Sequence, residues 1–481
     1  MYQGRLIKML TTLAPGEFRQ FVTYVKSPYF NSNEKLIKLV TYLQKVYPDF
    51  AEKKLTHKTL FETMYGKVET LNEQQIHDQL SQLLRLLENF FTQLNFESDT
   101  GGKYTYLLQA LRSRNLPKHF YRVYSRAEEQ LLSGTPITDS YLHLHRIEQQ
   151  AEAFSGKFEN RSANQLLQDQ ITHLDIYFLS VKLRSTCEML NRRNIINTDY
   201  QSEMDKEIYT YLLNGNSPYL KIPFVSIYFH IYLTLIEPEN ENHYQNLAIR
   251  LREHVGKLPP SEVYTLYAFA QNYCIKQINR GNPQYLHELF MLYQQLLDEG
   301  ILVDSGYLAH EHYKNITTVG LRLKAFDWVA GFLETYREKL HPEFRSNAYN
   351  YNLCVFYYEK GQYREAMKLL QQVDFSDLYY HLGAKSVLLK IYFELRDDDS
   401  LKYHILAFKA FLKRNRRISS FHYEGHLNLL QMVSRVARVR RMKPRLDAEV
   451  FELRRKELLE NIRAAGNIPN ASWLKQQTET L

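Results

Sequence analysis

The feature that most constrains this chain is a pattern of apolar and small residues that recurs about every 35 residues. Its clearest copy is the stretch NAYNYNLCVFYYEKGQYREAMKLLQQV, residues 347–373, in which Gly361 and Tyr363 mark a turn between two helices. Anchored on Tyr363, the same template falls on Phe326 and Asp398, which lie 37 residues before and 35 residues after it. Because one antiparallel helix pair cannot bury its apolar face alone, we expect such copies to stack around a continuous core.

Five positions around each anchor carry the packing pattern. They lie ten and six residues before the anchor and three, seven and ten residues after it, and fourteen of the fifteen side chains are apolar or aromatic. The sets are Ile316, Gly320, Val329, Leu333 and Tyr336; Leu353, Tyr357, Ala366, Leu370 and Val373; and Leu388, Tyr392, Leu401, Ile405 and Phe408. Small residues let two helices approach, and large ones fill the groove between them. The pattern predicts helix pairs over residues 308–414, with a degenerate last copy because Asp398 replaces the turn aromatic.

This pattern resembles the tetratricopeptide repeat. Leu353, Cys354 and Tyr357 form its large, small and aromatic series on the first helix, and Gly361 and Tyr363 follow at the turn. The resemblance covers about a quarter of the chain. It implies a right-handed α-solenoid of antiparallel helix pairs that binds proteins or peptides.

The whole chain also resembles an uncharacterised family of Bacteroidota cytoplasmic proteins of similar length. The segments that carry this resemblance are Ser27-Pro28-Tyr29-Phe30-Asn31, Asn272-Tyr273-Cys274-Ile275 and Phe326-Asp327-Trp328. It implies no particular activity.

Composition agrees with an all-α fold. The 481 residues include only 18 Gly and 14 Pro, whereas Rossmann-like and all-β folds need many glycine-containing turns. Aromatic residues reach 14%, which excludes a disordered chain. No segment shows sustained polar and apolar alternation, so the sequence predicts no strands.

Cysteine content and hydropathy indicate a cytoplasmic protein. The three cysteines, Cys187, Cys274 and Cys354, are an odd number without paired spacing, which is typical of a reducing compartment. The N-terminus shows no signal peptide. The longest uncharged run, residues 222–236, has 15 residues, and a membrane-spanning helix needs about 20. We therefore expect no membrane span.

The breaks in helical periodicity divide the chain into four parts. Residues 1–97 predict a small helical module, and the polar, glycine-containing stretch 97–102 predicts a linker. Residues 103–300 predict a divergent array of helix pairs, and residues 301–415 hold the tetratricopeptide-like copies. Residues 416–481 predict basic capping helices and a tail.

Motifs of catalysis are missing from the sequence. It contains no glycine-rich phosphate loop, no GxSxG elbow and no HExxH pair. His422 and His426 are four residues apart and share a helix face, but no third metal ligand lies near them, which favours a hydrogen-bonding or exposed pair. We therefore predict no enzyme activity, no catalytic residues, no cofactor and no metal.

First-helix positions that packing does not require should line a concave groove. Those with side chains suited to an extended peptide are Lys314, Arg322, Tyr351, Tyr358 and Lys390. The alternative is that these side chains make ordinary contacts between packed helices.

Positive charge is concentrated near the C-terminus. Residues 401–463 hold 16 Lys and Arg against 6 Asp and Glu, a net charge of +10, whereas the whole chain carries +8. The basic patch comprises Arg414, Arg416, Arg417, Arg435, Arg438, Arg441, Lys443 and Arg445. It is typical of a solvated polar cap, of nucleic-acid phosphate binding or of binding to an acidic protein.

These observations favour a non-catalytic protein-interaction scaffold whose partner is another protein or an extended peptide. The alternative is a protein that binds RNA or DNA backbone through the basic patch. Neither pattern predicts an oligomeric state.

Overall fold

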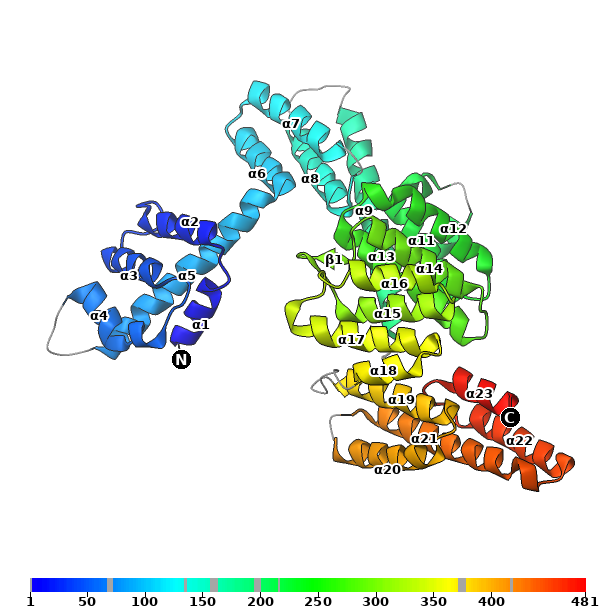
Figure 1. The fold of residues 1–481 in the computed structure, drawn as a ribbon. Helices are drawn as coiled ribbons and strands as arrows, with labels where there is room; N and C mark the ends of the chain where they lie inside the picture. Colours follow the sequence, from blue (N-terminus) through cyan, green and yellow to red (C-terminus); the bar gives the residue numbers. More distant parts are fainter. Residues whose placement is uncertain are drawn as a thin grey trace. The chain divides into compact units, whose positions relative to one another are not determined.

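The computed structural model describes residues 2–66, 72–133, 136–155, 163–193, 200–214, 217–370, 378–415 and 418–481. Helices make up most of these residues (Figure 1), which confirms the all-α class. One short hairpin departs from the prediction: β1 (Val303–Asp304) pairs antiparallel with β2 (Tyr307–Leu308). Its two turn residues, Ser305 and Gly306, both have positive φ, as a two-residue hairpin turn requires.

The chain divides into two compact units, Met1–Tyr228 and Phe229–Leu481. The division falls within α11 (Pro223–Ile236). Among the described residues, no helix combines the length and the apolar character that crossing a membrane would require.

The described residues of the first unit form ten α-helices before α11, together with two short 3₁₀ turns. Their bounds are α1 (Tyr2–Leu10), α2 (Pro15–Lys26), α3 (Glu34–Val46), η1 (Glu52–Lys54), α4 (His57–Tyr65), α5 (Glu73–Ser98), α6 (Thr100–Ser113), α7 (Pro117–Leu132), α8 (Thr138–Ser155), α9 (Ala163–Arg193), α10 (Asp205–Leu213) and η2 (Pro218–Lys221).

The long helix α5 organises the N-terminal part of this unit. It contacts α1, α2, α3 and α4, and its Leu83 and Leu87 lie in one apolar core with Phe18 and Phe21. Farther along the chain, α8 packs against α6, α7 and α9 around a second core that contains Phe120. The apolar spacing along each helix explains this arrangement, since every helix buries one face.

The predicted linker at residues 97–102 is instead a tight junction between two helices. Asp99 separates α5 from α6, and its Oδ1 accepts a hydrogen bond from the Gly102 backbone N–H at 2.8 Å. A Cβ added at Gly101 would lie 2.2 Å from Cγ of His143. Glycine is therefore present because α6 and α8 approach closely here, and the polar composition of this stretch does not reflect a linker.

The second unit contains the remaining helices and the hairpin. The bounds of its helices are α12 (Glu241–His254), η3 (Val255–Lys257), α13 (Pro260–Asn279), α14 (Tyr285–Asp298), α15 (His310–Arg322), α16 (Phe326–Thr335), α17 (Pro342–Glu359), α18 (Tyr363–Leu370), α19 (Leu378–Glu394), α20 (Asp398–Arg414), α21 (Ser420–Met442), η4 (Lys443–Arg445), α22 (Ala448–Ala464) and α23 (Ala471–Glu479).

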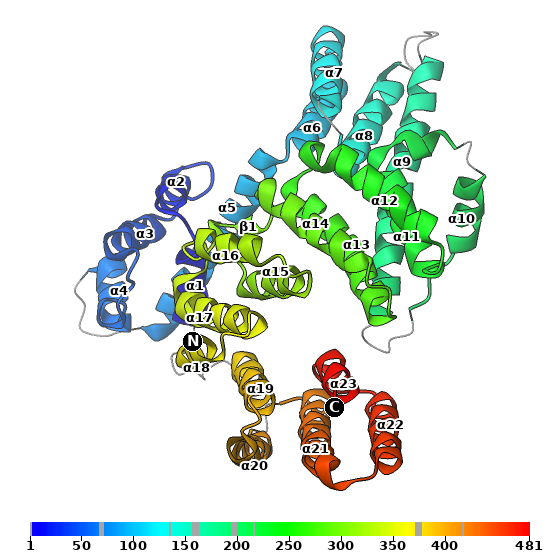
Figure 2. The same ribbon diagram turned by 45° about the vertical axis from the view of Figure 1, so that its right-hand side comes forward.

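Helices begin where the recurring pattern places its anchors. Phe326, Tyr363 and Asp398 are the first residues of α16, α18 and α20, respectively. Consecutive helices pack together from α12 to α23, and α17 also contacts α15 and α19 (Figure 2). The first helices of three successive pairs are therefore neighbours.

Packing inside the first pair explains the glycine among the apolar positions. Gly320 of α15 faces Val329 of α16, and a Cβ added at Gly320 would lie 2.5 Å from Cγ2 of Val329. Ile316 and Leu333 of the same set are buried. Val373, in the second set, lies outside the described residues.

The cysteines behave as buried apolar residues. Cys187, Cys274 and Cys354 all lie in the interior with free thiols. Burial raises the pKa of both Cys274 and Cys354 to about 12, so these thiols stay protonated and unreactive at neutral pH.

Candidate functional site

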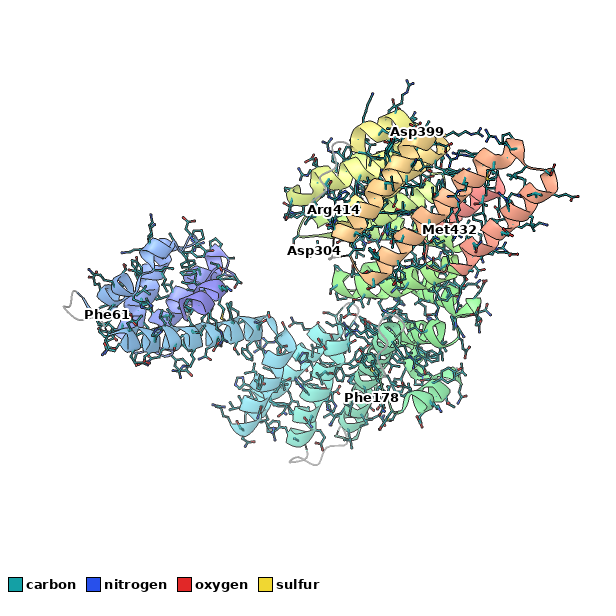
Figure 3. All side chains as sticks on the ribbon, turned by 90° about the horizontal axis from the view of Figure 1, so that it is seen from below. Phe61, Phe178, Asp304, Asp399, Arg414 and Met432 are labelled. Atoms are coloured by element: carbon teal, nitrogen blue, oxygen red, sulfur yellow. The ribbon has the colours of Figure 1, made fainter. Side chains whose placement is uncertain are left out.

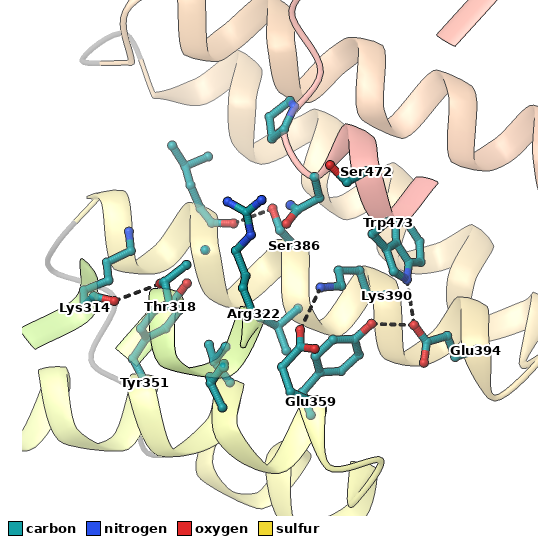
Figure 4. Close-up of a pocket in the computed structure, with 18 of the residues that line it drawn as sticks. Lys314, Thr318, Arg322, Tyr351, Glu359, Ser386, Lys390, Glu394, Ser472 and Trp473 are labelled. Atoms are coloured by element: carbon teal, nitrogen blue, oxygen red, sulfur yellow. Dashed lines mark hydrogen bonds and ion pairs between the residues drawn. The ribbon is translucent and has the colours of Figure 1, made fainter. Parts of the chain in front are cut away.

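A cavity of about 1080 Å³ opens in the second unit between α15, α17, α19, α21 and α23 (Figure 4). Three of these are first helices of the predicted pairs, and each contributes residues twelve, eight and four positions before its anchor. These residues are Lys314, Thr318 and Arg322; Tyr351, Val355 and Glu359; and Ser386, Lys390 and Glu394. Residues four apart share a helix face, which explains why they turn to the same side.

All five residues of the predicted groove line this cavity: Lys314, Arg322, Tyr351, Tyr358 and Lys390. These five side chains differ in their exposure to solvent. Tyr351, Tyr358 and Lys390 are 7%, 5% and 8% exposed, whereas Arg322 is exposed and Lys314 is half-buried. Packing between helices therefore accounts for three of them.

One side of the cavity, which we call the networked side, is formed by Tyr358, Glu359, Tyr363, Lys390, Glu394 and Trp473. At its centre, the carboxylate of Glu394 accepts three hydrogen bonds. The hydroxyls of Tyr358 and Tyr363 donate to Oε1 and Oε2, and the indole Nε1 of Trp473 donates to Oε1 at 2.6 Å. Burial and the neighbouring carboxylate raise the pKa of both tyrosines, so their hydroxyls remain donors.

Lys390 completes the networked side. Its Nζ lies 3.7 Å from Oε1 of Glu359 and 4.1 Å from the centroid of the Tyr358 ring. Burial lowers the pKa of Lys390, and the nearby Glu359 and Glu394 partly oppose that shift. The charged side chains of the networked side therefore interact with other side chains of the same side.

The opposite side, which we call the basic side, is formed by Lys314, Thr318 and Arg322 of α15. Lys314 places its Nζ 5.6 Å from the ring centroid of Tyr351 and 5.9 Å from that of Tyr380. Arg322 extends into the cavity (Figure 4), and among the described residues the structure shows no ion pair for it. Glu359 and Glu394 are the only described carboxylates in the lining, and both belong to the networked side.

Tyr351 reaches its position because of a glycine on the next helix. A Cβ added at Gly383 of α19 would lie 2.4 Å from the hydroxyl oxygen of Tyr351. The Tyr351 ring also meets that of Tyr380 edge-on, with centroids 5.1 Å apart. These contacts fix the aromatic surface over which Lys314 lies.

The sequence patterns missed the wall that α21 and α23 supply. This wall comprises Phe421, His422 and His426 of α21, residues 467–470 before α23, and Ser472, Trp473, Gln476 and Gln477 of α23. Trp473 lies 79 residues beyond Glu394 in the chain, outside the recurring pattern. No local sequence pattern could have predicted that Trp473 lies beside Glu394.

Both members of the histidine pair line the cavity. His426 is 6% exposed, and its Nδ1 lies 2.7 Å from the backbone oxygen of His422. Burial lowers the pKa of His426. Within the described ranges, no group of three or more His, Cys, Asp or Glu side chains is arranged to hold a metal ion.

The residues of the predicted basic patch differ in the contacts that they make. Arg414, Arg435, Arg438 and Arg445 are exposed, and Figure 3 shows Arg414 and Asp399 at opposite ends of α20. Arg441 lies 3.8 Å from Oδ2 of Asp398, and Lys443 donates to the backbone oxygen of Leu481. Arg416 and Arg417 lie outside the described residues.

Arg440, which was not predicted, contributes to structure. Its guanidinium donates to the backbone oxygen of Phe393 at 2.7 Å and lies 3.2 Å from Oδ1 of Asp398. Part of the C-terminal positive charge is therefore neutralised inside the fold, and the remainder faces solvent.

Comparison of the chain with protein-family models, with curated proteins and with solved structures finds no match. The resemblances proposed from the sequence therefore depend on the residues quoted for them.

Proposed function

We propose that this protein is a non-catalytic, cytoplasmic interaction protein of the tetratricopeptide-like kind. In this proposal, a right-handed solenoid of antiparallel helix pairs presents the cavity to an extended segment of another protein. The observation that carries the proposal is that three successive first helices direct the same three repeat positions into one cavity. Such an inner surface is how stacked helix pairs bind their partners.

The chemistry of the cavity suits a peptide. Its volume of about 1080 Å³ is at the upper end of the range for small-molecule sites. Aromatic rings and long charged side chains line it, and side chains of these kinds dominate the energetics of protein interfaces. No catalytic step and no cofactor is required in this proposal.

A substitution that fills the cavity tests the proposal. Val355 is half-buried at the middle repeat position of α17, so Val355→Arg should place a long cation in the cavity. We expect it to abolish the capture of partners seen by quantitative mass spectrometry of affinity-purified full chain, with nuclease treatment throughout. The matched control is Glu365→Arg on the exposed face of α18, which should retain them. If both variants capture the same partners, the cavity is not the binding site.

A second candidate function, binding of nucleic-acid backbone, is favoured by the exposure of Arg435 and Arg438 on α21. No described residue forms a recorded ion pair with either arginine. Phosphate contacts release counterions, so we expect affinity for a labelled RNA or DNA oligonucleotide to fall steeply with salt. Arg435→Glu combined with Arg438→Glu should reduce that salt slope. A flat salt response of the wild-type chain would rule this function out.

A further inference from the structure

Helix α9 of the first unit carries apolar side chains on two opposite faces. Ile176, on the face that packs against α8, is 5% exposed and lies in the same apolar core as Leu144 and Ile147 of α8. The opposite face points to solvent, and its apolar residues are Leu167, Ile171, Phe178 and Val181, which are 57%, 48%, 42% and 37% exposed. A helix that is apolar on both faces is usually buried on both, and exposed apolar patches commonly mark contact surfaces.

The exposed apolar residues form a continuous line along α9, which we call the α9 stripe. Figure 3 labels one of them, Phe178. The stripe consists of Leu167, Ile171, the half-buried Leu174, Phe178 and Val181, at successive spacings of four, three, four and three residues. This alternation is the spacing with which one helix packs along another in a coiled coil. The first and last residues of the stripe are 14 residues apart, which is about 21 Å of helix. The stripe therefore fits an apolar helix face of similar length.

The charges of α9 make the helix complementary to itself. Residues 163–177 hold two Asp and no Lys or Arg, a net charge of −2, whereas residues 178–193 hold four Lys and Arg and one Glu, a net charge of +3. Lys182 lies 3.3 Å from Asp205, and counting this Asp leaves the basic half at +2. Two copies of α9 that run antiparallel set each acidic half beside a basic half. A parallel pair would set like charges together, which is unfavourable.

We infer that the α9 stripe is a dimerisation surface, on which the α9 helices of two copies of this chain pack antiparallel around a two-fold axis near Leu174. In such an interface the same patch meets itself in reverse order. The Leu167 end of one copy then lies beside the Val181 end of the other, and Ile171 lies at the level of Phe178. Every one of these contacts joins apolar side chains, and the exposed face of α9 leaves solvent.

The size of the stripe sets the strength of this contact. It offers five side chains, whereas a stable interface usually involves about 20–30 residues on each side. We therefore expect a weak dimer, with a dissociation constant of about 10–100 µM. The stripe belongs to the first unit and the cavity to the second, so this inference does not depend on the proposed function.

Sedimentation equilibrium of the full chain, at concentrations from about 1 to about 200 µM, tests the inference. The mean mass should rise from that of one chain, 57.3 kDa, toward twice this value. Phe178→Glu should raise the dissociation constant at least tenfold, because it places a carboxylate in the apolar contact. The matched control is Leu107→Glu on α6, where the side chain is 41% exposed, and it should change the constant less than twofold. A wild-type chain that stays monomeric throughout, or equal losses for the two variants, would overturn the inference.

Mixing two variants tests the antiparallel arrangement. Ile171→Lys and Phe178→Glu should each impair dimerisation alone. An equal mixture should dimerise at least tenfold more tightly than either variant, because the new Lys of one copy then lies at the level of the new Glu of the other. A parallel pair would keep these positions two helical turns apart, and a mixture no better than its components would contradict the antiparallel arrangement. Unchanged thermal unfolding of both variants shows that the effect lies in association, and Val181→Lys replaces either variant that unfolds more readily.

Discussion

The two sides of the cavity use equivalent repeat positions in opposite ways. On the networked side, Glu394 is held by Tyr358, Tyr363 and Trp473, so its charge stabilises contacts among α17, α18, α19 and α23. On the basic side, Arg322 occupies the same position and extends into the cavity without a recorded ion pair among the described residues. One position of a repeat can therefore stabilise the fold in one copy and remain available to a partner in another.

The two sides differ because α23 packs over the networked side. Trp473 comes from α23, and its ring meets Phe393 of α19 edge-on at 5.4 Å between centroids. This places a donor beside Glu394 and excludes water from Lys390. Hydrogen bonds to a charged group strengthen when solvent is excluded.

The largest effect should follow from removing the carboxylate of the networked side. Glu394→Ala leaves three donors without their acceptor, and we expect it to lower the free energy of unfolding by about 3 kcal/mol. The measurement is urea unfolding followed by Trp473 fluorescence in a Trp328→Phe background.

The matched variant lies at the equivalent position of the basic side. Arg322→Ala should change the free energy of unfolding by less than about 0.5 kcal/mol, because exposed side chains without specific contacts contribute little. Equal losses for the two variants would show that the two sides do not differ in their role.

A smaller effect should come from the helix packing beside Lys314. Gly383→Ala would place a Cβ 2.4 Å from the Tyr351 hydroxyl, and we expect a loss of about 1–2 kcal/mol in thermal or urea unfolding. Adding Tyr351→Phe should restore part of it. The control is Gly331→Ala in α16, where an added Cβ meets nothing within 4 Å, and it should stabilise by about 0.5–1 kcal/mol. Stabilisation by both variants would show that the Tyr351 contact does not restrict position 383 and that the gain in helix propensity dominates.

The smallest effect concerns acid pH and the α21 wall. Burial lowers the pKa of His426 in the folded chain, whereas the unfolded chain binds a proton near pH 6.5. Below pH 6.5 the unfolded state therefore binds more protons, and stability falls as the pH decreases. Between pH 7 and pH 5 we expect His426 to contribute about 1–2 °C to the decrease in Tm, and His426→Gln should remove this part. An unchanged slope in that variant would place the acid sensitivity elsewhere, for instance at His381, whose pKa burial lowers to about 4.

Local patterns predicted the positions of the helices well and the junctions poorly. Each anchor begins a helix because turn residues and apolar spacing act over a few residues. The stretch 97–102 was wrongly predicted as a linker, since Gly101 is required by the close approach of His143 from α8 and Gly102 by the close approach of Asp99. The hairpin at residues 303–308 is too short to show alternation in the sequence.

The sequence by itself determined that this chain is helical and which first-helix residues turn toward a common cavity, because both follow from periodicity along one helix. Only the tertiary structure decided which of those residues are neutralised. Glu394 meets Tyr358 across 36 residues and Trp473 across 79, and no local pattern encodes such distances. Electrostatic interactions depend on separation in space and on the exclusion of water, and the packing of α23 against α19 sets both.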